Sequence, residues 1–173
     1  IVSASAAPAS GISALAADGD TLWVGTYGRG LAQWADGAWR VYRRADGGLP
    51  SDWITCLLSD ASGGVWVGTE RAGLAHMDGA GRWRSWTLPY EGVTEVTALA
   101  RVGSALWAGT PRGAAVLQPL TGAWRTLSRA DGLPAGAVRA MAADGDSLWL
   151  AGDGGFARWD WRGVTLGQVD LER

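Results

Sequence analysis

Three arginines are the residues of this sequence best placed to do chemistry. Each stands in a short glycine-rich bend: Arg29, Arg71 and Arg112. A guanidinium is permanently charged and carries N–H donors that suit carboxylates and other anions, so a set of them on one surface can orient a partner or steer an anion. The sequence leaves a structural alternative open, in which each arginine only holds an aspartate or a carbonyl of a neighbouring element.

The chain offers little material for catalysis or for a metal site. His76 is the only histidine and Cys56 the only cysteine, so there is neither a His–Cys cluster of metal spacing nor a disulfide framework. A Ser–His–Asp arrangement stays open geometrically, but nothing around His76 recommends it. We expect no catalytic residue, no metal and no cofactor. We interpret His76 as an ordinary strand residue and Cys56 as a small buried one.

Composition excludes two further classes. The net charge of −2 argues against a nucleic-acid binder, which needs a broad basic surface. No run approaches 18 apolar residues, so we expect no membrane span in this segment. The chain begins with Ile1 and shows no signal peptide, which indicates a processed segment or a piece of something longer. The 27 glycines and 12 tryptophans favour repeated hairpins over disorder.

The elements that must position the arginines repeat along the chain. The motif Leu22-Trp23-Val24-Gly25-Thr26 recurs twice, and a fourth copy is degraded to Leu148-Trp149-Leu150-Ala151-Gly152. From copy to copy the tryptophan returns after 43, 41 and 42 residues. A fixed period of about 42 residues through four copies is typical of a repeat architecture.

Each period divides into four short strands. In the first repeat we predict strands over 12–16, 21–26, 31–34 and 39–42, with turns at 18–20 and 35–37. No segment shows helical periodicity. The sequence therefore predicts an all-β fold, a β-propeller with four blades of four antiparallel strands. The recurring tryptophans of the second and fourth strands are interpreted first as packing residues between blades.

The repeats resemble the two-component regulator propeller repeat. The resemblance is carried by Gly48-Leu49-Pro50-Ser51, the Trp-Val-Gly-Thr strand with its glycine-rich bend, and the segment 117–124. It covers essentially the whole chain, although the third repeat enters through residues 88–93 instead of Gly-Leu-Pro. The family is best known from the extracytoplasmic sensor regions of bacterial hybrid histidine kinases, whose repeats close into seven-bladed propellers. No kinase, membrane helix or DNA-binding segment is present here.

Loops of a propeller alternate between its two faces, which sorts the charged residues into two rims. The rim formed by the strand-two-to-three bends and the blade entries is our candidate site for a ligand or partner. Its candidate residues are Arg29, Arg71, Arg112, Tyr27, Glu70, Trp53 and Asp153. The opposite rim collects aspartates of the tight turns, such as Asp18 and Asp20. We interpret these as turn residues rather than calcium ligands, because a calcium loop with its terminal glutamate is missing.

The resemblance implies a non-enzymatic ligand-recognition or sensing module of a bacterial signalling protein, in the periplasm or outside the cell. Its partner would be a small-molecule or oligosaccharide ligand, or another protein. The alternative is a structural propeller subunit, a scaffold that docks other proteins through its rims. Fold alone does not decide between them, because propellers carry unrelated functions.

The phase of the repeats predicts one propeller region over 1–173, with blades at about 8–47, 48–90, 91–131 and 132–173. Residues 1–7 take the place of an extra or closing outer strand, and residues 164–169 supply the last strand. Terminal blades left open would expose apolar faces. We expect the four blades to be part of a larger ring, completed by further chain or by a second copy. Closure into a compact four-bladed ring is the competing expectation.

Overall fold

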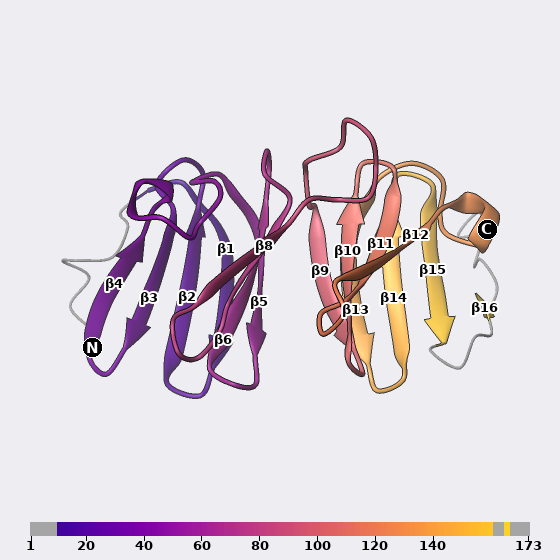
Figure 1. Cartoon of the computed structure of the whole chain (residues 1–173). Coiled ribbons are helices and arrows are strands. Elements are labelled where there is room, and N and C mark those ends of the chain that lie inside the picture. The colour runs from indigo at the N-terminus through magenta and orange to yellow at the C-terminus, as the bar shows by residue number, and fades with distance from the viewer. Residues whose placement is uncertain (1–9, 161–164, 167–173) are drawn as a thin grey trace. The chain divides into compact units, whose positions relative to one another are not determined.

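A computed structural model describes residues 10–160 and 165–166 as four antiparallel sheets, each of four strands (Figure 1). Two compact units divide the chain, Ile1–Thr87 and Leu88–Arg173, and each contains two sheets. In every sheet the strands lie in chain order, each pairing with the next. The predicted all-β architecture of four four-stranded blades is confirmed, whereas the extent of one region over 1–173 stays a prediction.

The first unit consists of two blades. Its strands are β1 (Ile12–Asp18), β2 (Thr21–Thr26), β3 (Leu31–Ala35) and β4 (Ala38–Tyr42) in blade 1, and β5 (Ile54–Asp60), β6 (Gly64–Thr69), β7 (Leu74–Met77) and β8 (Trp83–Trp86) in blade 2. A short 3-10 turn, η2 (Arg44–Asp46), follows β4.

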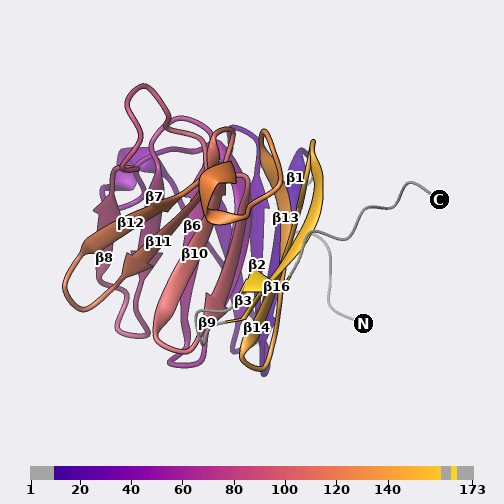
Figure 2. The same cartoon turned by 90° about the vertical axis from the view of Figure 1, so that its right-hand side faces the viewer.

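The second unit repeats this plan. Its strands are β9 (Ala98–Val102), β10 (Ala105–Thr110), β11 (Gly113–Gln118) and β12 (Ala123–Leu127) in blade 3, and β13 (Val138–Asp144), β14 (Ser147–Gly152), β15 (Gly155–Asp160) and β16 (Thr165–Leu166) in blade 4 (Figure 2). The 3-10 turn η3 (Arg129–Asp131) follows β12. Among the described residues no helix is long and apolar enough to cross a membrane.

Local sequence explains the hairpins. Between β3 and β4 the residues Asp36 and Gly37 both adopt positive φ, 52° and 76°. Two consecutive left-handed residues are what a type I′ turn requires, and its twist matches that of the flanking strands. Asp-Gly is the favoured pair for this conformation, so the predicted turn at 35–37 has its physical cause in these two residues.

Blades pack through the same two strands in both units. In the first unit β5 lies against β1 and β2, and in the second β13 lies against β9 and β10. Ile54 at the start of β5 is fully buried beside Trp23, and Val138 at the start of β13 is fully buried beside Trp107. The register of β5 and of β13 shifts just after this residue, which indicates a β-bulge.

The glycine of the repeated motif makes this packing possible. A Cβ added at Gly25 would lie 2.6 Å from Cγ2 of Ile54, closer than real Cβ atoms come to a neighbour. At Gly109 the same addition would lie 3.2 Å from Cγ1 of Val138. Gly25 and Gly109 therefore leave room for the β-branched residue that opens the second blade of their own unit.

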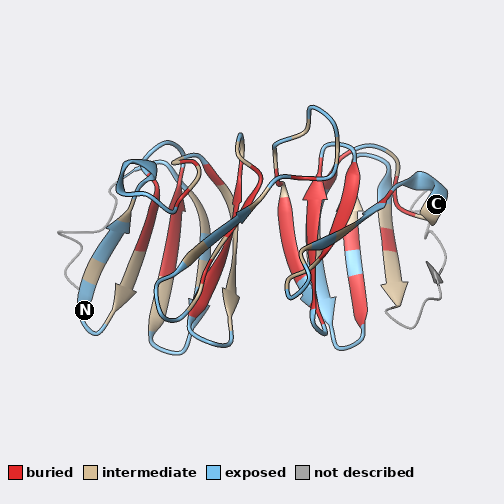
Figure 3. Cartoon of the chain, viewed as in Figure 1, coloured by how far each residue is buried: buried red, intermediate tan, exposed pale blue. Residues whose placement is uncertain are grey.

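Burial is concentrated in the inner strands of each sheet (Figure 3). All residues of β6 and of β10 are buried, whereas the outer strands β4, β8 and β12 are largely exposed. The tryptophans of the first three motifs are buried, with Trp66 only 3% exposed, but Trp149 of the fourth motif is 39% exposed. Cys56, interpreted from the sequence as buried, is only half-buried and stands just after the register shift of β5.

The unusual entry of the third repeat has a structural role of its own. The Tyr90 hydroxyl lies 2.7 Å from the carbonyl oxygen of Ala114 and 3.1 Å from that of Leu127, two residues that pair between β11 and β12. Burial raises the pKa of Tyr90, so the hydroxyl keeps the proton that it donates.

The predicted outer strand at 1–7, and most of the predicted last strand at 164–169, lie outside the described residues.

Candidate functional site

A threonine shapes each of the first three glycine-rich bends. In the first bend the buried Thr26 hydroxyl donates to the carbonyl of Gly30 at 2.8 Å and accepts from the backbone N–H of Arg29 at 3.1 Å. Thr69 makes the same pair of bonds, to the carbonyl of Gly73 and from the N–H of Ala72. Thr110 does so in a bend that is one residue shorter. These hydroxyls fix how each bend presents its side chains.

The threonines also show that Arg71 is not the structural equivalent of Arg29. Arg29 is the third residue after Thr26, whereas Arg71 is only the second after Thr69. The residue that matches Arg29 in the second bend is Ala72, because both donate their backbone N–H to the threonine hydroxyl. Arg29 and Arg71 therefore leave their bends at different positions.

The entry into blade 2 runs beside both bends of the first unit. The carbonyl of Asp52 accepts the backbone N–H groups of Gly28 at 2.9 Å and Gly30 at 3.1 Å, and the carbonyl of Trp53 accepts that of Glu70 at 3.0 Å. Tyr27 and Trp53 form an isolated β-bridge. This backbone network brings the two bends and Trp53 to one end of the unit.

A pocket of about 360 Å³ lies at this end. Its lining residues are Gly28, Arg44, Pro50, Ser51, Asp52, Trp53, Arg71 and Ala72. The Arg71 guanidinium lies 5.3 Å from the centre of the Trp53 ring, within the range of a cation–π contact, and its Nη2 is 3.5 Å from Glu70 Oε1. We call this pocket the rim pocket.

The rim pocket combines charge with an aromatic surface. The side chain of Arg71 is 68% exposed and Trp53 is 42% exposed, so both are accessible to a ligand. Asp52 is committed to the fold, since its Oδ1 accepts the backbone N–H of Arg44 at 2.8 Å. The arrangement can pair a ligand carboxylate or phosphate with a guanidinium while a ring lies on the indole.

Two other candidates of the first unit lie near the rim pocket without lining it. Tyr27 is 53% exposed, and its ring centre is 6.5 Å from that of Trp53. Arg29 is exposed in the first bend. The structure thus brings Tyr27, Trp53, Glu70 and Arg71 together, with Arg29 to one side.

The remaining candidates belong to the second unit. Arg112 is exposed, and its backbone N–H donates to the Thr110 hydroxyl at 3.2 Å. Asp153 forms an ion pair with Arg139, whose Nε is 3.0 Å from Asp153 Oδ1. The hydrogen bonds and charge of Arg139 lower the pKa of Asp153. Neither Arg112 nor Asp153 contributes to the rim pocket.

Sequence reasoning missed Arg44 as a pocket residue. It begins the 3-10 turn η2, which Asp46 stabilises by accepting the backbone N–H of Arg43 at 2.9 Å. The signal available in the sequence was the segment Arg43-Arg44-Ala45-Asp46 just before the glycines of the blade entry.

The acidic turns lie at the other end of the first unit. In blade 1, Ile12 pairs with Thr26 at the end of the bend, and Asp18 pairs with Thr21 at the opposite end. In blade 2, Ile54 pairs with Thr69 and Asp60 with Gly64 in the same sense. The Ser59 hydroxyl donates to the carbonyl of Ala17, which joins the two acidic ends.

His76 has a more specific environment than its sequence position suggests. Its Nε2 lies 2.7 Å from Oδ2 of Asp60, and its ring stacks on Trp66 with centres 4.1 Å apart. Burial of Asp60 opposes ionisation, but hydrogen bonds from Ser62 and His76 outweigh it and lower the pKa of Asp60. Within residues 10–160 no three His, Cys, Asp or Glu side chains gather as a metal site would require.

The lowered pKa of Asp60 predicts loss of stability in acid. Because the folded carboxyl has a lower pKa than the unfolded one, its stabilisation is complete above about pH 4 and is lost as the pH falls further. We expect the free energy of unfolding to fall below that pH, and the fall to be shallower in Asp60→Asn. Urea titrations at pH 3 to 7 measure the free energy of unfolding of both proteins, with Asp36→Asn in an exposed turn as control. An unchanged slope in Asp60→Asn would contradict the assignment.

Comparison with known proteins supports the repeat assignment over part of the chain. Residues 48–71 match the family model described as two component regulator propeller, which confirms the resemblance for this stretch. Among curated proteins, none matches the sequence.

Solved structures share the fold at low identity. The extracellular domain of BT4673 from B. thetaiotaomicron, described as a hybrid two component system, aligns with a TM-score of 0.76 at 20% identity, covering 95% of this chain and 23% of that one. The corresponding domain of BT3049 from the same organism aligns with a TM-score of 0.72 at 18% identity, covering 92% and 24%. An ancestral GH74 enzyme aligns with a TM-score of 0.71 at 13% identity, covering 94% and 24%. This chain spans less than a quarter of each of these chains.

Proposed function

We propose that this chain is a non-catalytic recognition module of an extracytoplasmic signalling protein, and that it binds an acidic oligosaccharide or similar acidic ring compound at the rim pocket. The observation that carries the proposal is the Arg71 guanidinium, held over the exposed Trp53 ring beside Arg44. An acidic sugar ring matches both features, because its carboxylate pairs with a guanidinium and its apolar face lies on an indole. The solved neighbours that are extracellular domains support the location.

Binding measurements on matched arginine variants test the proposal. Neutral and uronic-acid oligosaccharides are titrated by calorimetry into the unaltered chain, Arg71→Ala and Arg29→Ala. We expect only the acidic sugars to bind. Their affinity is expected to fall about tenfold or more in Arg71→Ala and to stay unchanged in Arg29→Ala. Arg29 is the suitable control because it is exposed in an equivalent bend but does not line the pocket. Equal loss in both variants, or no binding by the unaltered chain, would refute the rim pocket as the site.

A scaffold function is the second candidate, and the exposed pair of Tyr27 and Trp53 favours it. Both rings are accessible at the same end of the unit, and aromatic residues are enriched at protein interfaces. Failure of every acidic ligand with a chain that stays folded would favour this candidate over the first.

Completion by further chain or by a second copy is part of the proposal. Ile12 is 55% exposed and Leu15 61% exposed, whereas Ile54 at the position that matches Ile12 is fully buried against the preceding blade. The exposed pair thus supports a missing neighbour for blade 1. Sedimentation of the 18 kDa chain as a dimer or larger assembly agrees with completion by a second copy, whereas a stable monomer contradicts it.

A further inference from the structure

The two units fill the space between their outer strands differently. In the first unit Tyr42 of β4 donates its hydroxyl to Oε1 of Gln33 at 2.8 Å. The Tyr42 ring lies edge-on to Trp83 of the next blade at 6.0 Å, and 6.3 Å from the ring of Trp23. Three aromatic rings and one internal hydrogen bond close this space.

The second unit has smaller residues at two of these positions. Leu127 replaces Tyr42, because each pairs with the third-strand residue that lies opposite the motif glycine. Val116 replaces Gln33 opposite the motif tryptophan. The residue that pairs with Trp159 is Thr165, whereas its counterpart in the first unit is Trp83. Leu127 and Val116 therefore supply neither the aromatic ring of Tyr42 nor the amide of Gln33.

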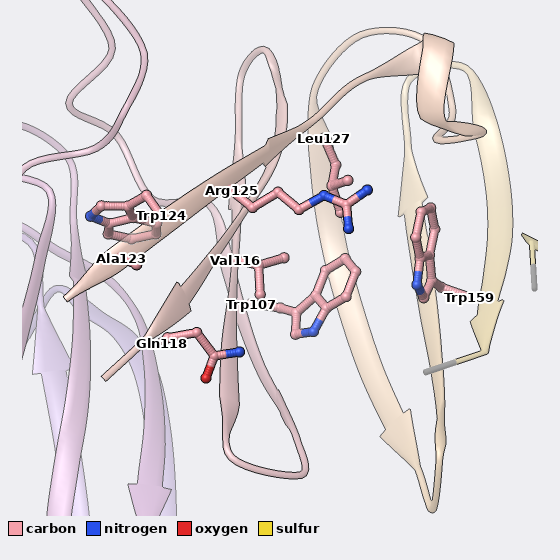
Figure 4. Close-up of a pocket in the computed structure, with 8 residues that line it drawn as sticks. All are labelled: Trp107, Val116, Gln118, Ala123, Trp124, Arg125, Leu127 and Trp159. Atoms are coloured by element: carbon pink, nitrogen blue, oxygen red, sulfur yellow. The ribbon is translucent and has the colours of Figure 1, made fainter. Parts of the chain in front are cut away.

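A pocket of about 340 Å³ occupies this space in the second unit (Figure 4). Its lining residues are Trp107, Val116, Gln118, Ala123, Trp124, Arg125, Leu127 and Trp159. Trp107 and Trp159 meet edge to face with centres 5.7 Å apart, so they form a corner rather than a slot. An aromatic ring placed in this corner would restore the packing that Tyr42 and Trp83 provide in the first unit.

Two polar groups of this pocket have no partner among the residues that the structure describes. Nε1 of Trp107 is buried and has no hydrogen-bond partner within the described chain, which is uncommon for a buried donor. Arg125 is exposed and has no ion-pair partner among residues 10–160. Figure 4 shows its side chain extending from β12 toward Leu127 and Trp159. The pocket therefore offers aromatic walls, a free N–H and one permanent positive charge.

We propose that this pocket binds a small planar aromatic carboxylate, independently of the rim pocket. The ring packs in the corner formed by Trp107 and Trp159, and the carboxylate pairs with the Arg125 guanidinium at the pocket mouth. Apolar walls favour a ring, and the unpaired charge favours an anion over a neutral compound of the same size.

Calorimetric titration with indole-3-acetate, and with neutral indole and acetate as controls, tests the proposal. We expect indole-3-acetate to bind, indole to bind more weakly and acetate not to bind. Arg125→Gln is expected to lower the affinity for indole-3-acetate by about tenfold or more without changing the affinity for indole. Arg40→Gln is the matched control, because Arg40 pairs with Gln33 as Arg125 pairs with Val116 in the corresponding strands.

A second variant fills the pocket with residues that the first unit already accommodates. The double substitution Leu127→Tyr and Val116→Gln is expected to abolish binding of indole-3-acetate while the thermal midpoint stays at or above that of the unaltered chain. Arg71→Ala is expected to leave this binding unchanged, which separates it from the rim pocket. No binding by the unaltered chain, or unaltered binding by both Arg125→Gln and the double variant, would overturn the proposal.

Discussion

Replacing Trp66 by alanine is expected to lower the free energy of unfolding by about 3–5 kcal/mol, the usual cost of removing a buried tryptophan. Trp66 is 3% exposed, and its ring stacks on His76 and lies 5.3 Å from the ring of Trp86. Alanine leaves a cavity at these contacts and removes the ring that stacks on His76, the hydrogen-bond partner of Asp60. We expect a loss of the same size for Trp107, which is 2% exposed.

Trp53 supplies the control for this prediction. It is 42% exposed at the entry to blade 2, so Trp53→Ala removes fewer buried contacts and should cost much less. Urea denaturation followed by circular dichroism compares the variants without relying on tryptophan fluorescence. Equal midpoints for Trp66→Ala and Trp53→Ala would show that the motif tryptophans are not the packing residues of the blades.

Replacing Gly25 by alanine is expected to cost about 1–3 kcal/mol, because one added methyl group overpacks the contact between blades 1 and 2. The new Cβ would lie 2.6 Å from Cγ2 of Ile54, and that side chain is fully buried and unable to move aside freely. Gly25 has no special backbone conformation, so the cost measures the clash rather than backbone strain.

A double-mutant cycle isolates this contact. Ile54→Ala removes Cγ2 and destabilises the core on its own, but it also removes the atom that the Gly25→Ala methyl group would meet. We expect the two changes together to cost less than the sum of the separate costs. Additive costs from thermal denaturation would mean that Gly25 does not provide the space for Ile54.

The blades were predictable because each strand is specified by residues close in sequence. The predicted strand over 21–26 is β2 with the same bounds, and the turn at 35–37 is set by Asp36 and Gly37. The exposure of Trp149 was not predictable from its motif, since the tryptophans of the first three copies are buried at the same strand position.

The candidate site was predictable in part. Sequence phase placed Tyr27, Trp53 and Arg71 at one end, and the first unit brings them together. It could not separate Arg71, which lines the pocket, from Arg29, which does not, because the pocket depends on how the two bends and the entry into blade 2 lie together. The pocket beside Trp107 was not predictable for another reason: it arises from residues that are smaller than their counterparts in an earlier repeat.

Ala151 has a consequence for the assembly of the repeats. It occupies the motif position of Gly25 and carries the methyl group that Gly25 lacks. In each unit the motif glycine of the first blade leaves room for the first strand of the second blade, whereas blade 4 has Ala151 at this motif position. A following repeat, or a second copy offering Ile12, therefore has less room beside Ala151 than Ile54 and Val138 have beside Gly25 and Gly109.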